Sequence, residues 1–178
     1  MRKKKKKLVP GEGDYYYIDS EISTFNKKLS SNDKNQLDKI INVYSKLFFV
    51  ELFGYFIFDR RFKLWIKINQ EDIYTDEVIT KRLIDYYGEE KYNEFYKMKP
   101  MNHYRQWLGS VPNYMSKVRT TFSKWYNKSN NRCGGFWNSK YKYKIYENEF
   151  ELLDSLVYSN VLKSVDELQI EDIQKNKN

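Results

Sequence analysis

The chain has 178 residues, of which 40% are hydrophobic and 18% aromatic, so it can bury one core and is not intrinsically disordered. The formal net charge is +8, but residues 2–7 alone carry six positive charges, so the basic character of the remainder is local. One cysteine, Cys133, excludes an intramolecular disulfide, and no stretch approaches the ~20 apolar residues of a membrane span, which favours a cytoplasmic protein without membrane contact.

The first residues form a basic arm, residues 1–13, ahead of a single domain expected over residues 14–165 and a tail over residues 166–178. Like charges in the arm repel one another, so we expect it to stay extended unless an anion orders it. Phosphate contact is the functional interpretation, and a solubilising tail is the alternative. The candidate contacts in the arm are Lys3, Lys4, Lys5, Lys6 and Lys7.

The start of the domain has the pattern of a strand, a helix and a second strand. Tyr15 to Ile18 is aromatic and follows a glycine-containing loop, which predicts the first strand. Ser31-Asn32-Asp33 offers an N-cap to a helix whose apolar residues recur from Leu37 to Phe48. The run from Phe49 to Phe58 is too apolar for a sheet edge, so it predicts a central strand with a bulge at Gly54.

A neighbouring strand is expected after the break at residues 59–61. Alternation with period two gives this strand an apolar face, made of Phe62, Leu64, Ile66 and Ile68. The opposite face carries the candidate nucleic-acid contacts Arg61, Lys63, Trp65 and Lys67. Three cations and an indole suit phosphate contact with base stacking, and an ordinary solvent-facing sheet is the alternative.

The segment over about residues 71–106 has the pattern of a helical insertion. Thr75 or Asp76 caps a helix that stops at Gly88, and Glu89 to Met98 predicts a short second helix. This acidic, amphipathic stretch suits contact with another protein. His103 is the only histidine of the chain, and the next helix is expected to begin only after it, at Ser110.

The helix that Ser110 caps has an apolar stripe from Val111 to Trp125 and a basic opposite side. Cations on the basic side of a helix are suited to contact with phosphates, or they simply solvate the surface. The candidate nucleic-acid contacts on this helix are Lys117, Arg119 and Lys124.

An asparagine-rich loop and the Gly134-Gly135 turn lead into Phe136-Trp137 and then a strand with a basic ladder. In this strand Lys140, Lys142 and Lys144 alternate with Tyr141, Tyr143 and Ile145, so the lysines share one face. A basic strand predicts a nucleic-acid surface on which Trp137 and Tyr141 stack with unpaired bases; a solvated strand face is the alternative.

A helix from Glu149 to Tyr158 is predicted to close the domain. Its apolar side is expected to contain Phe150, Leu152, Leu153, Leu156 and Val157.

Residues 107–158 resemble the single-domain HUH tyrosine transposases, in particular the REP-associated tyrosine transposases. The resemblance rests on the order of a helix with the pair Tyr114-Met115, an asparagine-rich loop, a G-x-F-W turn, a basic strand and LL-x-x-L-x-Y. The first half adds YYYI as a first strand and GYFIF with DRRFKLWIKI as a central hairpin. The similarity covers Tyr15 to about Val165, with residues 71–106 as a variable insertion.

This resemblance implies a ferredoxin-like α+β fold with an antiparallel sheet flanked by helices, and recognition of imperfect DNA hairpins. It also implies nicking of single-stranded DNA by a tyrosine that forms a 5′-phosphotyrosine link. A divalent metal held by an H-x-H pair assists such a reaction, because a tyrosine with a pKa of about 10 is a poor nucleophile at neutral pH.

The sequence departs from the family at the catalytic positions. The histidine motif falls on residues 58–63, where Arg61 and Lys63 replace the two histidines, and neither cation binds a divalent metal. The similar segment over residues 101–107 contains His103 but has Arg105 in place of a second histidine. Tyr158 takes the position of the nucleophile, and Ser159-Asn160 replaces the Asn-Pro that usually follows it.

The leading hypothesis is therefore a domesticated, catalytically inactive transposase relative that binds hairpin or single-stranded DNA or RNA without a cofactor. In this hypothesis Arg61 and Lys63 hold a phosphate in place of the metal, and Tyr158 is a packing or stacking residue. The alternative is a metal-dependent nickase that uses Tyr158 and completes its site with a second subunit or with Glu147, Glu149 or Glu151.

A third hypothesis is an accessory subunit that holds a larger nucleic-acid enzyme on its template, in a defence or mobile-element system. The predicted contact surface for this protein partner is Asp76 to Met98. A homodimer is a further possible assembly.

Overall fold

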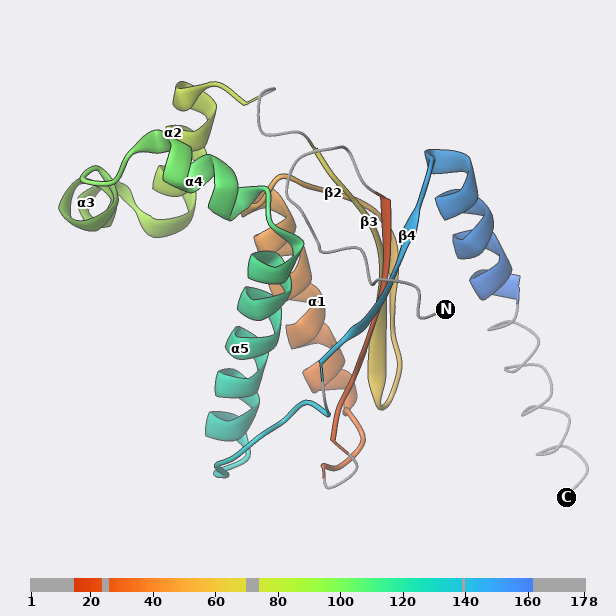
Figure 1. The fold of residues 1–178 in the computed structure, drawn as a ribbon. Coiled ribbons are helices and arrows are strands. Elements are labelled where there is room, and N and C mark those ends of the chain that lie inside the picture. The colour runs from red at the N-terminus through yellow and green to blue at the C-terminus, as the bar shows by residue number, and fades with distance from the viewer. Residues whose placement is uncertain (1–14, 24–25, 70–73, 139, 162–178) are drawn as a thin grey trace, which may run out of the picture.

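A four-stranded antiparallel sheet with helices on both faces organises the computed structural model, which describes residues 15–23, 26–69, 74–138 and 140–161 (Figure 1). The strands are β1 (Tyr15–Glu21), β2 (Val50–Ile57), β3 (Arg61–Ile68) and β4 (Lys142–Tyr146), in the order β2-β3-β1-β4. The predicted α+β fold with an antiparallel sheet is confirmed. The arm over residues 1–13, with Lys3 to Lys7, and the tail over residues 166–178 lie outside the described residues.

Helices α1 (Ser31–Leu47) and α5 (Val111–Ser129) cover the inner face of the sheet (Figure 1). The N-cap of α1 is Ser30, one residue before the predicted cap: its hydroxyl accepts from the Asp33 N–H at 3.2 Å, and the Asp33 carboxylate accepts from the Ser30 N–H at 2.8 Å. This reciprocal capping box holds the first turn. Ser110 caps α5 as predicted, and Phe122 of α5 is fully buried beneath the sheet.

Strand β2 corrects one prediction, because it lies at the sheet edge and not at the centre. The pairing of β2 with β3 is irregular between Leu52 and Gly54, which confirms the predicted bulge. The edge strand is apolar because both of its faces are covered. Helix α1 packs on the inner face, and Leu156 approaches Gly54 on the outer face.

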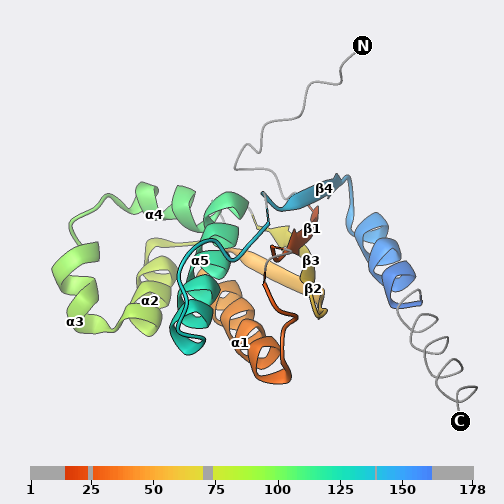
Figure 2. The ribbon, with the colours of Figure 1, turned by 90° about the horizontal axis from the view of Figure 1, so that it is seen from below.

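The insertion packs as a group of helices beyond one end of the sheet (Figure 2). Its helices are α2 (Asp76–Tyr87), α3 (Glu89–Lys91), the π-helical turn η2 (Tyr92–Tyr96) and α4 (Met101–Leu108). Thr75 caps α2, and Gly88 with φ of 87° ends it, as predicted. Helix α4 was not predicted; Pro100 precedes its first residue, and Tyr104 and Leu108 bury its apolar side.

No helix in the described part of the chain is long and apolar enough to cross a membrane.

The outer face of the sheet is covered by a helix over residues 149–161, on the side opposite α1 and α5 (Figure 1). Asn148 caps this helix by accepting a 3.0 Å hydrogen bond from the Glu151 N–H. Leu152 is fully buried against the sheet. The expected single apolar side divides into two, because Phe150 and Val157 are 80% and 60% exposed on the far side of the helix.

The close approach of this helix to β2 requires the absence of a side chain at residue 54. A Cβ atom at Gly54 would lie 2.9 Å from Leu156 Cδ2, inside the normal contact distance. Because Gly54→Val forces Leu156 away from the sheet, we expect the free energy of unfolding to fall by about 1–3 kcal/mol. Urea titration followed by tryptophan fluorescence measures this change.

Leu156→Ala is the matched partner in a double-mutant cycle. The double variant should lose less stability than the sum of the single variants, since the shortened side chain makes room for valine. Additive losses would show that the two residues do not compete for the same space.

Candidate nucleic-acid interface

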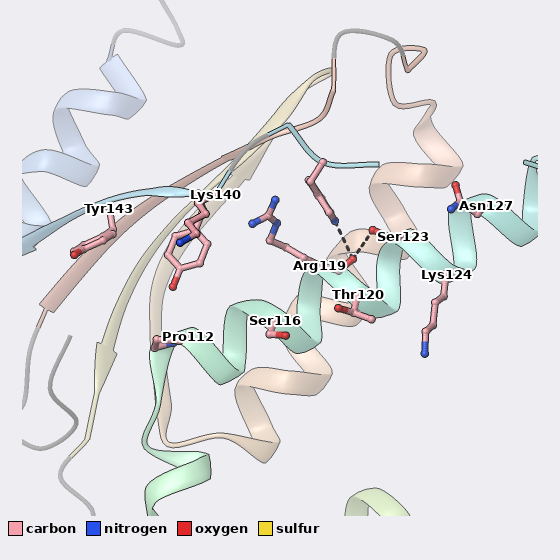
Figure 3. Close-up of a pocket in the computed structure, with 11 residues that line it drawn as sticks. Pro112, Ser116, Arg119, Thr120, Ser123, Lys124, Asn127, Lys140 and Tyr143 are labelled. Carbon is pink, nitrogen blue, oxygen red and sulfur yellow. Dashed lines mark hydrogen bonds between the residues drawn. The ribbon is translucent and has the colours of Figure 1, made fainter. Parts of the chain in front are cut away.

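A cleft of about 870 Å³ runs between α5 and a wall made of Trp137, Lys140, Tyr141 and Tyr143, of which Tyr143 belongs to β4 (Figure 3). Both walls come from the sequence patterns already described, the basic side of α5 and the start of the basic ladder. The lining residues are Pro112, Ser116, Arg119, Thr120, Ser123, Lys124, Asn127, Trp137, Lys140, Tyr141 and Tyr143.

Arg119 is the charged centre of the cleft. Its guanidinium carbon lies 5.4 Å from the ring centroid of Trp137 and 6.0 Å from that of Tyr141. The Trp137 indole N–H donates to the Arg119 carbonyl at 2.9 Å, and the Ser123 hydroxyl donates to the same oxygen at 2.8 Å. Burial lowers the pKa of Arg119 from its ordinary value, although a guanidinium remains charged at neutral pH. The tryptophan and the arginine are therefore held in a fixed relation.

Two tyrosines, Tyr141 and Tyr143, and two lysines, Lys124 and Lys140, also line the cleft. Burial raises the pKa of Tyr141 above its ordinary value, so its hydroxyl stays neutral. Lys124 and Lys140 are exposed, and Tyr143 is 38% exposed. A half-buried cation, two exposed cations and accessible aromatic rings form a surface that can bind a phosphate and stack on a base.

The structure brings together five of the predicted contacts in this cleft: Arg119, Lys124, Trp137, Lys140 and Tyr141. Lys140 and Tyr141 precede β4 and are not part of the strand, which begins at Lys142. Lys117 does not line the cleft; its ammonium lies 5.5 Å from the ring centroid of Trp107.

Sequence analysis missed the polar residues of α5 that line the cleft. Ser116, Thr120, Ser123 and Asn127 recur three or four residues apart, so the helical period places them on the same face as Arg119. This helical spacing could have identified the four residues from the sequence.

The other predicted contacts in the described part of the chain lie on the outer face of the sheet. The strand register places Asp19 of β1 beside Lys63 of β3 and Lys142 of β4. The residues that share this face include Arg61, Lys63, Trp65, Lys67, Lys142 and Lys144. The predicted alternation is therefore confirmed for β3 and for Lys142 and Lys144 of β4, while Lys140 precedes the strand and lines the cleft.

Trp65 corrects the prediction of an exposed stacking residue, because its side chain is fully buried. The 149–161 helix lies over it, and the indole N–H donates to the Ser155 hydroxyl at 2.8 Å. The rings of Tyr17 and Phe56 lie 5.0 and 5.6 Å away, centroid to centroid. In this structure Trp65 is a core residue and not a platform for bases.

Carboxylates and aromatic rings engage the cations of the outer face. Arg61 lies 3.4 Å from Asp19 and 3.0 Å from Glu21, and Lys142 lies 4.0 Å from Glu21. The predicted phosphate contact of Arg61 thus competes with two carboxylates. Lys67 lies 3.9 Å from Glu51. The ammonium of Lys63 lies 5.6 Å from the Phe58 ring centroid, and that of Lys144 lies 4.3 Å from the Tyr146 ring centroid. The face carries less uncompensated positive charge than its sequence indicates.

Arg61 and Lys63, which the sequence resemblance aligns with a metal-binding histidine pair, do not fit a divalent cation. Arg61 and Lys63 offer no lone pair at neutral pH. Within the described ranges, no group of three or more His, Cys, Asp or Glu side chains is placed to hold a metal ion. His103 lies on α4 beside the ring of Tyr104, within the insertion.

The acidic residues proposed for a nickase have a structural role at the start of the 149–161 helix. The Glu151 carboxylate accepts from the Glu147 N–H at 3.4 Å, while Glu149 lies in the first turn. Tyr158 is 66% exposed on the same helix.

Comparison with solved structures shows which folds this chain resembles. A REP-associated tyrosine transposase bound to a REP hairpin aligns with a TM-score of 0.55 at 8% sequence identity, covering 92% of this chain and 74% of that chain. A protein assigned as a transposase from Deinococcus radiodurans R1 aligns with a TM-score of 0.45 at 10% identity, covering 89% of this chain and 96% of that chain. No protein-family model matches the sequence, and no curated protein matches it. The chain thus shares the fold of the first of these transposases.

Tyr17, on the outer face of the sheet, should make the stability of the protein depend on pH. Burial and the neighbouring Asp19 carboxylate raise the pKa of Tyr17 from 10.0 to about 12. Between these values the unfolded tyrosine loses its proton while the folded one keeps it, so stability falls as the pH rises. Tyr17→Phe removes this contribution, and its free energy of unfolding should fall less steeply than that of wild type from pH 10 to 12. Denaturant titrations across this range compare the two slopes, and equal slopes would contradict the assignment.

Proposed function

We propose that this protein binds nucleic acid in the cleft between α5 and the wall of Trp137, Lys140, Tyr141 and Tyr143. The observation that carries the proposal is the position of the Arg119 guanidinium, 5.4 Å from the Trp137 ring centroid and 6.0 Å from that of Tyr141. Lys124 and Lys140 line the same cleft. Cations bind phosphates in any nucleic acid, and aromatic faces stack on bases that are not paired.

The ligand is a hairpin or a single strand of DNA or RNA. Trp137 and Tyr141 line the cleft, and their rings can stack only on bases that are free of a duplex stack. A hairpin provides such bases in its loop and a regular series of phosphates in its stem. The shared fold with a transposase bound to a REP hairpin supports this choice.

Binding without strand cleavage is the second part of the proposal. At the positions where similar enzymes hold a metal, Arg61 contacts two carboxylates and Lys63 packs on aromatic rings. These residues neutralise charge, but they do not coordinate an attacking and a leaving oxygen as a metal does. The protein then acts as a domesticated transposase relative, with an accessory role to a larger nucleic-acid enzyme.

The cleft lysines should set the salt dependence of binding. Lys124→Gln combined with Lys140→Gln removes two phosphate contacts, so the slope of log affinity against log salt should decrease in magnitude by about 1 for each lysine. Fluorescence anisotropy with a labelled hairpin and a labelled single strand of equal length measures both slopes.

Lys91→Gln combined with Lys97→Gln is the matched control, because these exposed lysines lie on the insertion. It removes the same charge from the chain away from the cleft. If the slope of log affinity against log salt decreases equally in both double variants, nucleic acid is attracted to the basic chain in general and not bound in the cleft.

The alternative function is nicking of a single strand by Tyr158, which the high exposure of this side chain permits. Under the binding proposal, a strand labelled at its 3′ end, the end that a 5′-phosphotyrosine link would retain, forms no covalent adduct with the protein in magnesium or manganese, and Tyr158→Phe leaves affinity unchanged. Denaturing electrophoresis after incubation detects an adduct. A labelled band that forms with wild type and disappears with Tyr158→Phe would establish the nickase.

A further inference from the structure

The 149–161 helix has a second apolar face, directed away from the sheet. Leu152, Ser155 and Leu156 face the sheet, where Ser155 contacts Trp65 and Leu156 contacts Gly54. Phe150, Val157 and Val161 are 80%, 60% and 55% exposed. With a rotation of about 100° per residue, these three side chains fall within an arc of about 40° on the opposite side of the helix.

This outward face is a concentrated patch. Among the described residues, four of the eight large hydrophobic side chains that are exposed belong to this one helix, including Tyr158 at 66%. The others are Val43, Val78, Met98 and Tyr143, which lie on other segments. Single exposed apolar side chains are normal, whereas several on one helix face indicate a contact surface.

The charge around the patch defines what fits it. Residues 147–161 contain Glu147, Glu149, Glu151 and Asp154 and no lysine or arginine, in a chain whose net charge is +8. Capping accounts for Glu151, whose carboxylate accepts from the Glu147 N–H. At 100° per residue, exposed Asp154 falls among the outward apolar side chains, exposed Glu151 lies to one side of them, and Glu149 lies toward the sheet-facing side. The outward face is thus both apolar and acidic.

We propose that this face docks a second protein through an apolar helix or groove that is edged by lysine and arginine. Opposite charge at the rim guides such a partner, and the row of Phe150, Val157 and Val161 supplies the buried contact. Pairing with the same helix of a second copy sets carboxylates against carboxylates, which is unfavourable. The surface differs from Asp76 to Met98, the segment that the sequence favoured for protein contact.

The position of the face allows the partner and the nucleic acid to bind together. Figures 1 and 2 show the 149–161 helix on one side of the sheet, with α5 on the other side. A protein held here would lie on the opposite side of the domain from the cleft. The inference stands without the nucleic-acid proposal, because it rests on the helix alone.

A synthetic amphipathic peptide of leucine and lysine tests the chemistry of the surface in the full-length protein. The labelled peptide should bind wild type in fluorescence anisotropy, and Phe150→Asp combined with Val157→Asp should weaken binding at least about tenfold. Met98→Asp is the control, because it places the same charge at another exposed apolar residue. Circular dichroism and hairpin affinity, measured on the same samples, verify that the variants are folded.

The peptide of the same composition in scrambled order should bind at least tenfold more weakly than the amphipathic one. Failure of wild type to bind the peptide, or equal binding by wild type and the double variant, would overturn the proposal. Sedimentation velocity provides a further test: a wild-type dimer that the double variant abolishes would assign the face to a second copy and overturn the choice of partner.

Discussion

The packing of the 149–161 helix on the outer face of the sheet determines which surfaces of this protein remain available for binding. The contact depends on Gly54, which lets Leu156 reach the strand, and on the hydrogen bond between Trp65 and Ser155. Because Trp65 is fully buried, the centre of a face that is basic and aromatic in the sequence is covered, while Arg61, Lys142 and Lys144 stay exposed around it. The cleft beside α5 combines cations with aromatic rings that remain accessible.

The same two residue types, arginine and tryptophan, have different roles on the two sides of the sheet. Arg61 lies between carboxylates of β1, so its charge is compensated within the protein. Arg119 packs near two aromatic rings, and burial rather than an acidic partner dominates the shift of its pKa. A guanidinium that is already partly desolvated on ring faces loses less hydration when it meets a phosphate. Because Arg61 must release two carboxylates before it can bind an anion, the outer face is the less favourable site at this position.

Local patterns predicted most of the elements, because caps, turns and alternation are encoded by neighbouring residues. Thr75 with Gly88, Ser110, and the alternating faces of β3 and β4 all followed from such signals. The edge position of β2 did not, since it depends on the pairing of β3 with the distant β1. The burial of Trp65 did not either, since it depends on a helix that begins more than eighty residues later in the chain. For the same reason the cleft was predicted only as separate halves: α5 supplies Arg119, and the distant segment after the loop supplies Trp137 and Tyr141.

The 149–161 helix is apolar on two sides, and folding needs only one of them. One apolar side is sufficient to cover β2 and β3, as the burial of Leu152 and the fit of Leu156 show. Selection for folding alone therefore does not account for Phe150, Val157 and Val161, which leave a large apolar area in water. The acidic residues of this helix disfavour its pairing with a second copy and repel nucleic acid, which is also negative. The two proposed binding surfaces would therefore be separated by charge as well as by position.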